Sequence, residues 1–397
     1  MRFTRLHILF IIVLCFGRKK VSDIIYLDYA SSAPPYEEVC RTVRETMYYC
    51  YANPGSVHSA AAPCRRILRE SRKKMADLLG FRDSSVYFTS GGTEANNTAV
   101  CSGAYVTGRK QIIVSAQEHS SVLYPALSLR DAGFAVDLVY PDSFGRINPG
   151  DVASLAGRNT ALICIQAANN ETGVIQDIEA FAAIARDVGA LYLCDAVQSF
   201  CHADMALNCA DMVTLSAHKF GGPRGVGCLA LREGLRLRPL IHGGGQEFGL
   251  RSGTENVPGI AGMSLAAQLA CSELKNEDKR QRELIGLLIS LISRKIQELR
   301  INSGDARRLP GIVNLGFPGI SGEEMLTRLD SAGICVSAGS ACAAGDRDPS
   351  HVLLSMGQSR AEAGEAVRIS VGRMTSEAEI YTAAGEIVNI VQKKQTE

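Results

Sequence analysis

The sequence predicts an α/β protein in which helices cover a mostly parallel sheet. From Ile24 onward, short apolar runs of strand length alternate with longer amphipathic stretches of helical length, a pattern typical of such sheets. The 397 residues are enough for a two-domain enzyme with an ample core. The 38 glycines, many of them in short clusters, indicate tight turns and backbone that lies close to a ligand.

The first part of the chain contains seven expected strands and three expected helices. The strands are short apolar runs at residues 85–89, 111–115, 135–140, 161–166, 190–194, 212–216 and 227–231. Helices are expected at 94–106, 120–132 and 178–188, where apolar residues recur at spacings of three and four.

The character of the chain changes after Arg251. Residues 256–299 are rich in Ala, Leu, Glu, Lys and Arg and predict one or two long helices. Strands at 311–317, 334–337 and 366–371 and helices at 322–332 and 376–392 then predict a smaller α+β domain. We therefore expect a large domain at 35–275 and a small domain formed by 21–34 together with 276–397.

Residues 1–20 are kept out of the fold prediction. Arg2 and Arg5 precede an apolar run at 8–16, as in a secretory signal, but Arg18 follows where a small-residue cleavage site would stand. The nine apolar residues fall short of the roughly 20 that span a bilayer. We expect neither secretion nor membrane anchoring, and the status of this leader is left open between an upstream extension and an apolar tail packed on the body.

Composition excludes several classes of protein. The 42 basic and 41 acidic residues nearly balance, so direct nucleic-acid binding is not expected. The 13 cysteines are odd in number and lack C-x-x-C spacing, which argues against a disulfide framework and against a structural zinc site. A reducing, cytoplasmic location is the simpler expectation.

The segment Ser90-Gly91-Gly92-Thr93-Glu94 follows an expected strand and opens an expected helix. Its backbone N–H groups and the Thr93 hydroxyl would face an anion at the positive end of that helix. Such a segment is more often only a tight turn with a capping Thr. It matches neither a Walker loop nor G-x-G-x-x-G, which argues against an NTPase and the usual dinucleotide fold.

Two further strand ends carry reactive side chains. Asp195 and Gln198 follow one apolar strand, and Ser216, His218 and Lys219 follow another, just before a glycine turn. A lysine in that position is partly desolvated, which suits it to Schiff-base chemistry. An anion site, a carboxylate and a lysine are together the three groups that pyridoxal 5'-phosphate requires.

With these residues, the sequence resembles the NifS/IscS type of cysteine desulfurase within the class V aminotransferase family of fold type I pyridoxal phosphate enzymes. The resemblance runs from about Tyr26 to the C-terminal helix. Its motifs are YLDYA at 26–30, NPGS at 53–56, TSGGTE at 89–94, EH at 118–119, NNE at 169–171, DAVQS at 195–199, SAHK at 216–219, HGGGQE at 242–247, RSGT at 251–254, SAC at 340–342 and VGR at 371–373.

The resemblance implies removal of sulfur from L-cysteine, giving L-alanine and an enzyme-bound persulfide for iron–sulfur cluster assembly or tRNA thiolation. Lys219 would bind the cofactor and shuttle protons, and His119 would stack on its ring. The other implied cofactor residues are Gly92, Thr93, Asn170, Asp195 at the ring nitrogen, Gln198 at the ring hydroxyl, Ser216, His218, and Thr254 from the neighbouring subunit of a homodimer. Arg373 would bind the substrate carboxylate, assisted by Asn53.

Cys342 is the expected sulfur nucleophile. It stands in a run of small residues without an aliphatic anchor, whereas Cys164, Cys194, Cys228 and Cys335 lie in apolar strand patterns. No resident metal is implied, apart from a transient contact of Cys342 with an iron–sulfur cluster on an acceptor protein such as an iron–sulfur scaffold. The residues after Cys342 depart from the Ser/Thr-rich run of the family, so the acceptor is left open.

Three alternatives remain open at this point. A selenocysteine lyase and a class V aminotransferase use the same cofactor residues, and Cys342 is what favours sulfur transfer. A non-catalytic scaffold is the third alternative, and the presence of Lys219, Asp195, His119 and Cys342 argues against it.

Overall fold

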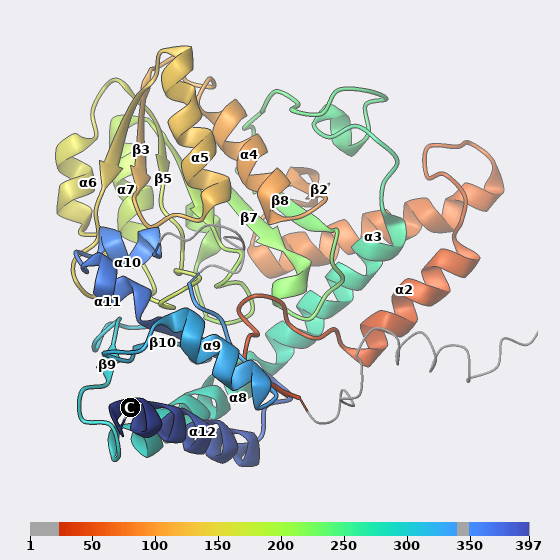
Figure 1. The fold of residues 1–397 in the computed structure, drawn as a ribbon. Helices are drawn as coiled ribbons and strands as arrows, with labels where there is room; N and C mark the ends of the chain where they lie inside the picture. The colour runs from red at the N-terminus through yellow and green to blue at the C-terminus, as the bar shows by residue number, and fades with distance from the viewer. Residues whose placement is uncertain (1–23, 340–348, 397) are drawn as a thin grey trace, which may run out of the picture.

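The computed structural model describes residues 24–339 and 349–396. Its largest sheet has seven strands (Figure 1) in the order β2 (Val86–Thr89), β8 (Gly227–Leu231), β7 (Met212–Ser216), β6 (Leu191–Asp195), β5 (Thr160–Cys164), β3 (Gln111–Ser115) and β4 (Ala135–Val139). Strand β8 runs antiparallel to both β2 and β7, and the other neighbouring pairs are parallel. The predicted α/β class and the mostly parallel seven-stranded sheet are therefore confirmed.

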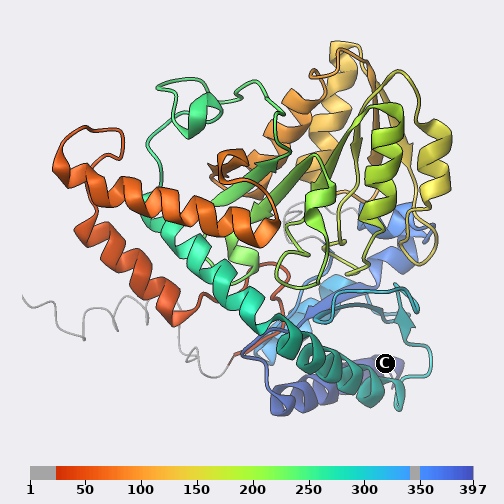
Figure 2. The same cartoon turned by 180° about the vertical axis from the view of Figure 1, so that it is seen from behind.

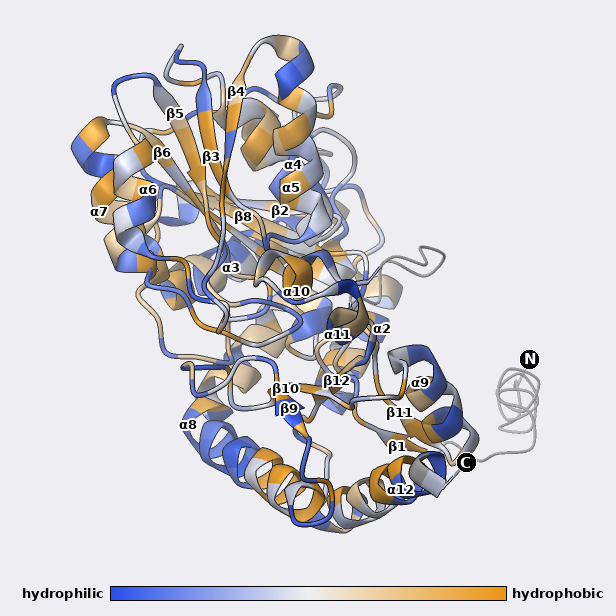
Figure 3. Cartoon of the chain, turned by 60° about the vertical axis from the view of Figure 1, so that its left-hand side comes forward, coloured by the Kyte–Doolittle hydropathy of each residue, from blue (hydrophilic) through white to orange (hydrophobic). Residues whose placement is uncertain are grey.

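The strands of this sheet are apolar on both faces because helices cover both. Successive residues point to opposite sides, so that Leu162 packs in the core beneath α4 (Gly92–Gly103) and α5 (Ser120–Ser128), whereas Ile163 packs in the core beneath α3 (Ala62–Leu79) and α7 (Ile178–Val188). Figure 3 shows the strands as apolar ribbons between these two layers. Burial on both sides explains the short continuous apolar runs in the sequence.

A single helix, α8 (Val257–Ser293), links this core to a second one. Its first half, from Val257 to Ala270, belongs to the core of the large sheet, and its later residues Leu284, Leu288 and Ile292 belong to the second core. Helices α2 (Glu37–Tyr49) and α3 pack against α8, as the view from behind shows (Figure 2). The predicted stretch 256–299 thus contains one long helix, which ends at Ser293.

The second core lies between small sheets and helices from the C-terminal part of the chain. Strand β10 (Ile312–Gly316) pairs antiparallel with β12 (Ala366–Ser370) and β9 (Arg300–Ile301), while β1 (Ile25–Tyr26) pairs parallel with β11 (Ile334–Cys335). Helices α9 (Gly322–Ser331) and α12 (Glu377–Thr396) pack on these strands together with α8. A segment near the N-terminus thereby joins the C-terminal third of the chain.

Some elements differ from the prediction. The expected helix 120–132 is α5 followed by a 3-10 turn at Leu129–Ala132, and α5 contains Pro125, which cannot donate an N–H bond. Helix α4 begins two residues before the predicted start. Helices α2, α3, α6 (Pro149–Leu155), α10 (His351–Ser355) and α11 (Arg360–Gly364) were not predicted. No helix in the described part of the chain is long and apolar enough to cross a bilayer.

Candidate active site

A cavity of about 520 Å³ opens beyond the carboxyl ends of β2, β6 and β7. Ligands of open α/β sheets bind at this edge, and the volume is in the range of small-molecule sites. Nine of the residues expected at the cofactor line it: Gly92, Thr93, His119, Asn170, Asp195, Gln198, Ser216, His218 and Lys219. The structure therefore brings together side chains that lie up to 127 residues apart in the sequence.

The predicted anion cradle forms one wall of this cavity. Helix α4 begins at Gly92, beside Thr93 and Ser216. A Cβ atom on Gly92 would lie 2.9 Å from Cγ2 of Val197, and one on Gly227 would lie 2.5 Å from the carbonyl carbon of Gly91. Gly92 thus lies against the Val197 side chain and Gly227 of β8 lies against the backbone of the turn, which leaves no room for a Cβ atom at either position.

Glu94 connects the same turn to Arg251. Its Oε2 accepts a hydrogen bond from the Ser90 N–H at 2.9 Å, and its Oε1 lies 3.0 Å from Nε of Arg251. The carboxylate thus joins the cradle to the segment that contains Thr254. This attachment was not predicted from the sequence.

Asp195 is held by two hydrogen bonds at the end of β6. Its Oδ1 accepts from the N–H of Val197 at 2.9 Å, and its Oδ2 accepts from Nδ2 of Asn96 at 2.7 Å. Asn96 itself is 1% exposed, donates to Oγ of Ser121 at 2.9 Å and accepts from Oγ1 of Thr214 at 2.6 Å. The carboxylate orientation is therefore set by a buried amide that sequence reasoning missed.

His119 caps the N-terminus of α5 and is neutral. Its Nδ1 accepts from the N–H of Ser121 at 3.1 Å and lies 2.7 Å from the Ser121 hydroxyl oxygen. Because Nδ1 accepts, the proton of the neutral ring is assigned to Nε2. Burial lowers the pKa of His119 most, Lys219 and His351 lower it further, and Asp195 opposes them.

Lys219 follows β7 in a 3-10 turn and points toward the N-terminal segment. Its Nζ donates to the carbonyl oxygens of Ala30 at 2.7 Å and Ser31 at 3.0 Å. Gln198 also donates to the Ala30 carbonyl, at 2.6 Å. Burial, followed by the charges of Lys219 and Arg224, lowers the pKa of the neighbouring His218 to about 4.

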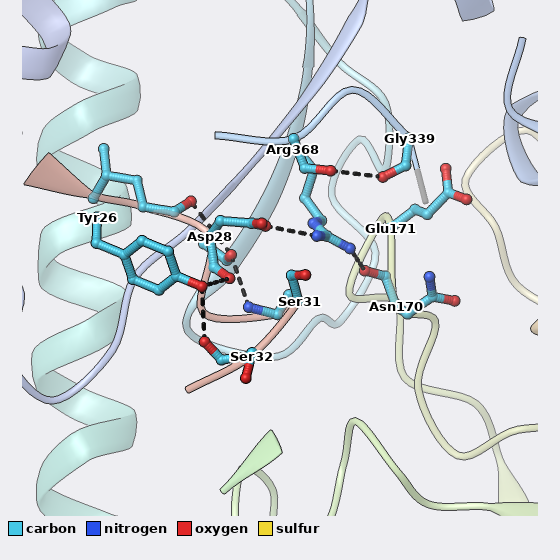
Figure 4. A network of polar contacts seen from close by, with 12 residues as sticks. Tyr26, Asp28, Ser31, Ser32, Asn170, Glu171, Gly339 and Arg368 are labelled. Atoms are coloured by element: carbon cyan, nitrogen blue, oxygen red, sulfur yellow. Dashed lines mark hydrogen bonds and ion pairs between the residues drawn. The ribbon is translucent and has the colours of Figure 1, made fainter. Parts of the chain in front are cut away.

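Arg368 on β12 also lines the cavity, although the sequence analysis did not name it. It donates through Nη2 to Oδ1 of Asp28 at 2.7 Å and through Nη1 to the Asn170 carbonyl at 2.8 Å (Figure 4). The residue is 2% exposed, and its Nε makes no hydrogen bond within the described chain. A buried guanidinium with donor capacity left over is suited to bind an anion.

Three expected site residues, Arg373, Asn53 and Thr254, do not line this cavity. Arg373 donates to the carbonyls of Pro34 at 3.2 Å and Pro35 at 2.7 Å and lies over the Tyr36 ring, in a second, smaller cavity. Asn53 and Thr254 are exposed on surface loops. Cys342 lies outside the described residues.

A family model described as aminotransferase class-V matches residues 25–382. The chain belongs to this family.

Named relatives of this class-V chain cover nearly its whole length. It is 36% identical over 376 residues to "Cysteine desulfurase IscS" of Dictyoglomus turgidum, covering 94% of this chain and 95% of the relative. It is 38% identical over 372 residues to "Cysteine desulfurase IscS 1" of Archaeoglobus fulgidus, covering 93% and 97%.

Solved structures superpose on this chain over most of its length. A "NIFS-LIKE PROTEIN" superposes with a TM-score of 0.87 at 33% identity, covering 93% of this chain and 100% of that one. "SspA in complex with cysteine" superposes with a TM-score of 0.78 at 34% identity, covering 87% and 98%. The match covers both the sheet and the smaller C-terminal part, so the fold type I assignment is confirmed.

Proposed function

We propose that this protein is a pyridoxal 5'-phosphate-dependent cysteine desulfurase that converts L-cysteine to L-alanine and keeps the sulfur as a persulfide. The proposal depends on four groups that line one cavity. They are Lys219, the neutral His119, the glycine turn at Gly92, and Asp195, whose carboxylate accepts two hydrogen bonds. The relatives named as cysteine desulfurases support the same activity.

The residues present fit the cofactor. A glycine cradle that a Cβ atom would fill suits a phosphate, and a carboxylate fixed by two hydrogen bonds suits a protonated ring nitrogen. When bound, pyridoxal 5'-phosphate supplies an electron sink for negative charge that develops on the substrate. Lys219 would hold the cofactor through Nζ, and the same nitrogen would take up and return protons.

We assign the substrate carboxylate to Arg368 and not to Arg373. Arg368 lines the cavity and keeps an unused donor, while Asp28 and the Asn170 carbonyl fix its orientation. Arg373 is turned toward the carbonyls of two prolines. These contacts fit better with a role of Arg373 in positioning the N-terminal segment. The same segment contains the Ala30 and Ser31 carbonyls, which accept hydrogen bonds from Lys219.

Cys342 is the proposed nucleophile. Its thiolate attacks the substrate sulfur, the carbon–sulfur bond breaks with its electron pair leaving on carbon, and protonation of that carbon gives alanine. Ser350 and His351, which follow 340–348 in the chain, are held by residues next to the cavity lining. Ser350 Oγ donates to Glu171 Oε2 at 2.5 Å, next to Asn170, and His351 Nε2 lies 2.9 Å from the carbonyl of Glu118, next to His119.

The enzyme is proposed to act as a homodimer that passes its sulfur to an acceptor protein, such as an iron–sulfur scaffold. The tip between α2 and α3 and the segment with Thr254 project at the same end of the molecule (Figures 1 and 2). Large side chains are exposed there, at Tyr48 (75%), Tyr51 (82%) and Phe248 (69%). Aromatic side chains are enriched at protein–protein interfaces. A protein that sediments as a monomer while retaining bound cofactor would contradict the dimer.

Incubating the purified protein with L-cysteine and measuring alanine and sulfide together tests the activity. Desulfuration yields alanine and, with a thiol reductant, an equal amount of sulfide. An aminotransferase would form an oxo acid, and a scaffold would form neither product. Selenocysteine offered in parallel separates the lyase alternative, which would release selenide while leaving cysteine intact.

A further inference from the structure

A second cavity, of about 70 Å³, lies behind Lys219, between the segment that follows β6 and helix α8. Cys201 forms part of its wall, together with Gln198 and Lys219. The Sγ atom of Cys201 lies 2.9 Å from the Sγ atom of Cys271, which stands on α8. These two residues are 70 positions apart in the sequence, so no spacing rule could have paired them.

The backbone at Cys201 is in the left-handed region, with φ of 63°. Side-chain-bearing residues adopt this conformation rarely, and outliers of this kind concentrate at functional positions. A cysteine held there faces a second cysteine across the helix interface. Two separate observations, the backbone conformation and the sulfur contact, therefore point to the same pair.

We propose that Cys201 and Cys271 form a redox-active dithiol that a hydroperoxide oxidises to an intramolecular disulfide. A disulfide bond is about 2.05 Å long, so the sulfurs need to approach by less than about 1 Å. The thiolate of Cys271 attacks the peroxide oxygen, which forms a sulfenic acid and releases water or an alcohol. The Cys201 thiol then attacks that sulfur, and a second water leaves with the remaining thiol proton.

The surroundings assign the two roles. Cys271 is the more accessible residue, whereas Cys201 is 7% exposed. The sulfur contact with Cys201 lowers the pKa of Cys271, the group that must react first, while burial opposes this effect. The nucleophile and the resolving thiol of the proposed pair are thereby distinguished.

Oxidation would tie the wall of the Lys219 site to the helix that joins the two cores. Cys201 lies three residues after Gln198, and the next residue, His202, has its Nε2 3.1 Å from the Lys219 carbonyl. Cys271 lies on α8 just after the last residue of α8 that belongs to the core of the large sheet. The bond would close a loop of about 70 residues, which limits the unfolded state more than the folded one.

The test treats the folded holoenzyme with a small excess of hydrogen peroxide, blocks the remaining thiols, and digests the protein without reduction. We expect a cross-linked peptide pair that contains Cys201 and Cys271, lost on treatment with dithiothreitol. The oxidised protein should also unfold at a higher denaturant concentration than the reduced protein. The variants Cys201→Gly and Cys271→Ala should each lose both effects, and glycine suits the backbone at 201.

The matched control is Cys40→Ser, which removes an exposed thiol on α2. It should leave the cross-link and the stabilisation unchanged. The proposal is overturned if peroxide gives separate sulfinic acids at the two positions, or if the cross-link appears only after the protein has been unfolded. Peptide mapping of the wild-type protein decides the matter even where a variant fails to fold.

Discussion

Replacing Arg368 by lysine tests the proposed grip on the substrate carboxylate. The guanidinium already donates to Asp28 and to the Asn170 carbonyl and keeps Nε in reserve. A lysine keeps the positive charge opposite Asp28 but cannot reproduce this planar set of donors. Loss of one hydrogen bond to a charged group costs about 1.5–3 kcal/mol, which corresponds to a KM for L-cysteine raised roughly 10- to 150-fold.

The assay is alanine production over a range of cysteine concentrations, with thermal unfolding to confirm the fold. Arg373→Lys is the matched control, since it makes the same change five residues away on the chain. We expect Arg373→Lys to change KM by less than about threefold, because the contacts of Arg373 with the Pro34 and Pro35 carbonyls and with the Tyr36 ring lie outside the larger cavity. A raised KM in Arg373→Lys with an unchanged KM in Arg368→Lys would refute the assignment.

Four further predictions follow from the site. Lys219→Ala should fold normally but lose the absorbance of covalently held cofactor and lower turnover by roughly 10²–10⁴-fold or more, measured by spectrum and alanine assay. Cys342→Ser should keep the absorbance change on adding cysteine but release no sulfide, whereas Cys335→Ser should stay active; a persulfide mapped by mass spectrometry to another residue would contradict this. Asn96→Ala removes the donor to Asp195, worth about 1.5–3 kcal/mol, and should lower kcat/KM about 10-fold or more and alter its pH profile. The cofactor-free protein should lose at most about 3 kcal/mol of unfolding free energy as pH falls from 6.5 to about 4, because the unfolded chain protonates His218 first; His218→Asn should flatten this dependence, and denaturant titrations at several pH values measure it.

The large sheet could be predicted because its strands are buried on both faces and therefore stand out as apolar runs. The strands at 111–115, 212–216 and 227–231 agree with β3, β7 and β8 to the residue. Helix α2 could not be recognised in this way, since it buries only Val39 and Thr46 and presents Met47, Tyr48 and Tyr49 to the surface. The division into 35–275 and 21–34 with 276–397 stays a prediction.

The strand-end residues of the site could also be predicted, because parallel strands bring their carboxyl ends to one edge. Asn96 could not, since it lies one turn inside α4, where an amide looks like any helical polar residue. Arg368 could not, because its place at the cavity depends on β12 of another sheet passing next to Asn170. No local pattern in the sequence reports such an approach between distant segments.

The charges that line the cavity suit it to bind two anions, the cofactor phosphate and the substrate carboxylate, and to transfer protons. The cationic side chains among the described lining residues are Lys219, Arg224 and Arg368, and the acidic ones are Asp195 and Glu94. Among them, Arg368 is paired with Asp28 and Glu94 with Arg251, and the three cationic side chains outnumber the two acidic ones. Neutral histidines therefore supply hydrogen bonds beside this modest positive excess.

Glu118, next to His119, is buried beside this site. Burial, reinforced by the charge of Asp195, raises the pKa of Glu118 well above its usual range, although the N–H of Gln166 opposes this by donating to Oε1 at 2.8 Å. The raised pKa favours the neutral carboxyl, so Glu118 adds less negative charge beside His119 than an exposed glutamate would. A charged Glu118 would instead favour the protonated form of His119. It would also place a second negative charge close to the position where negative charge develops on the substrate during the reaction.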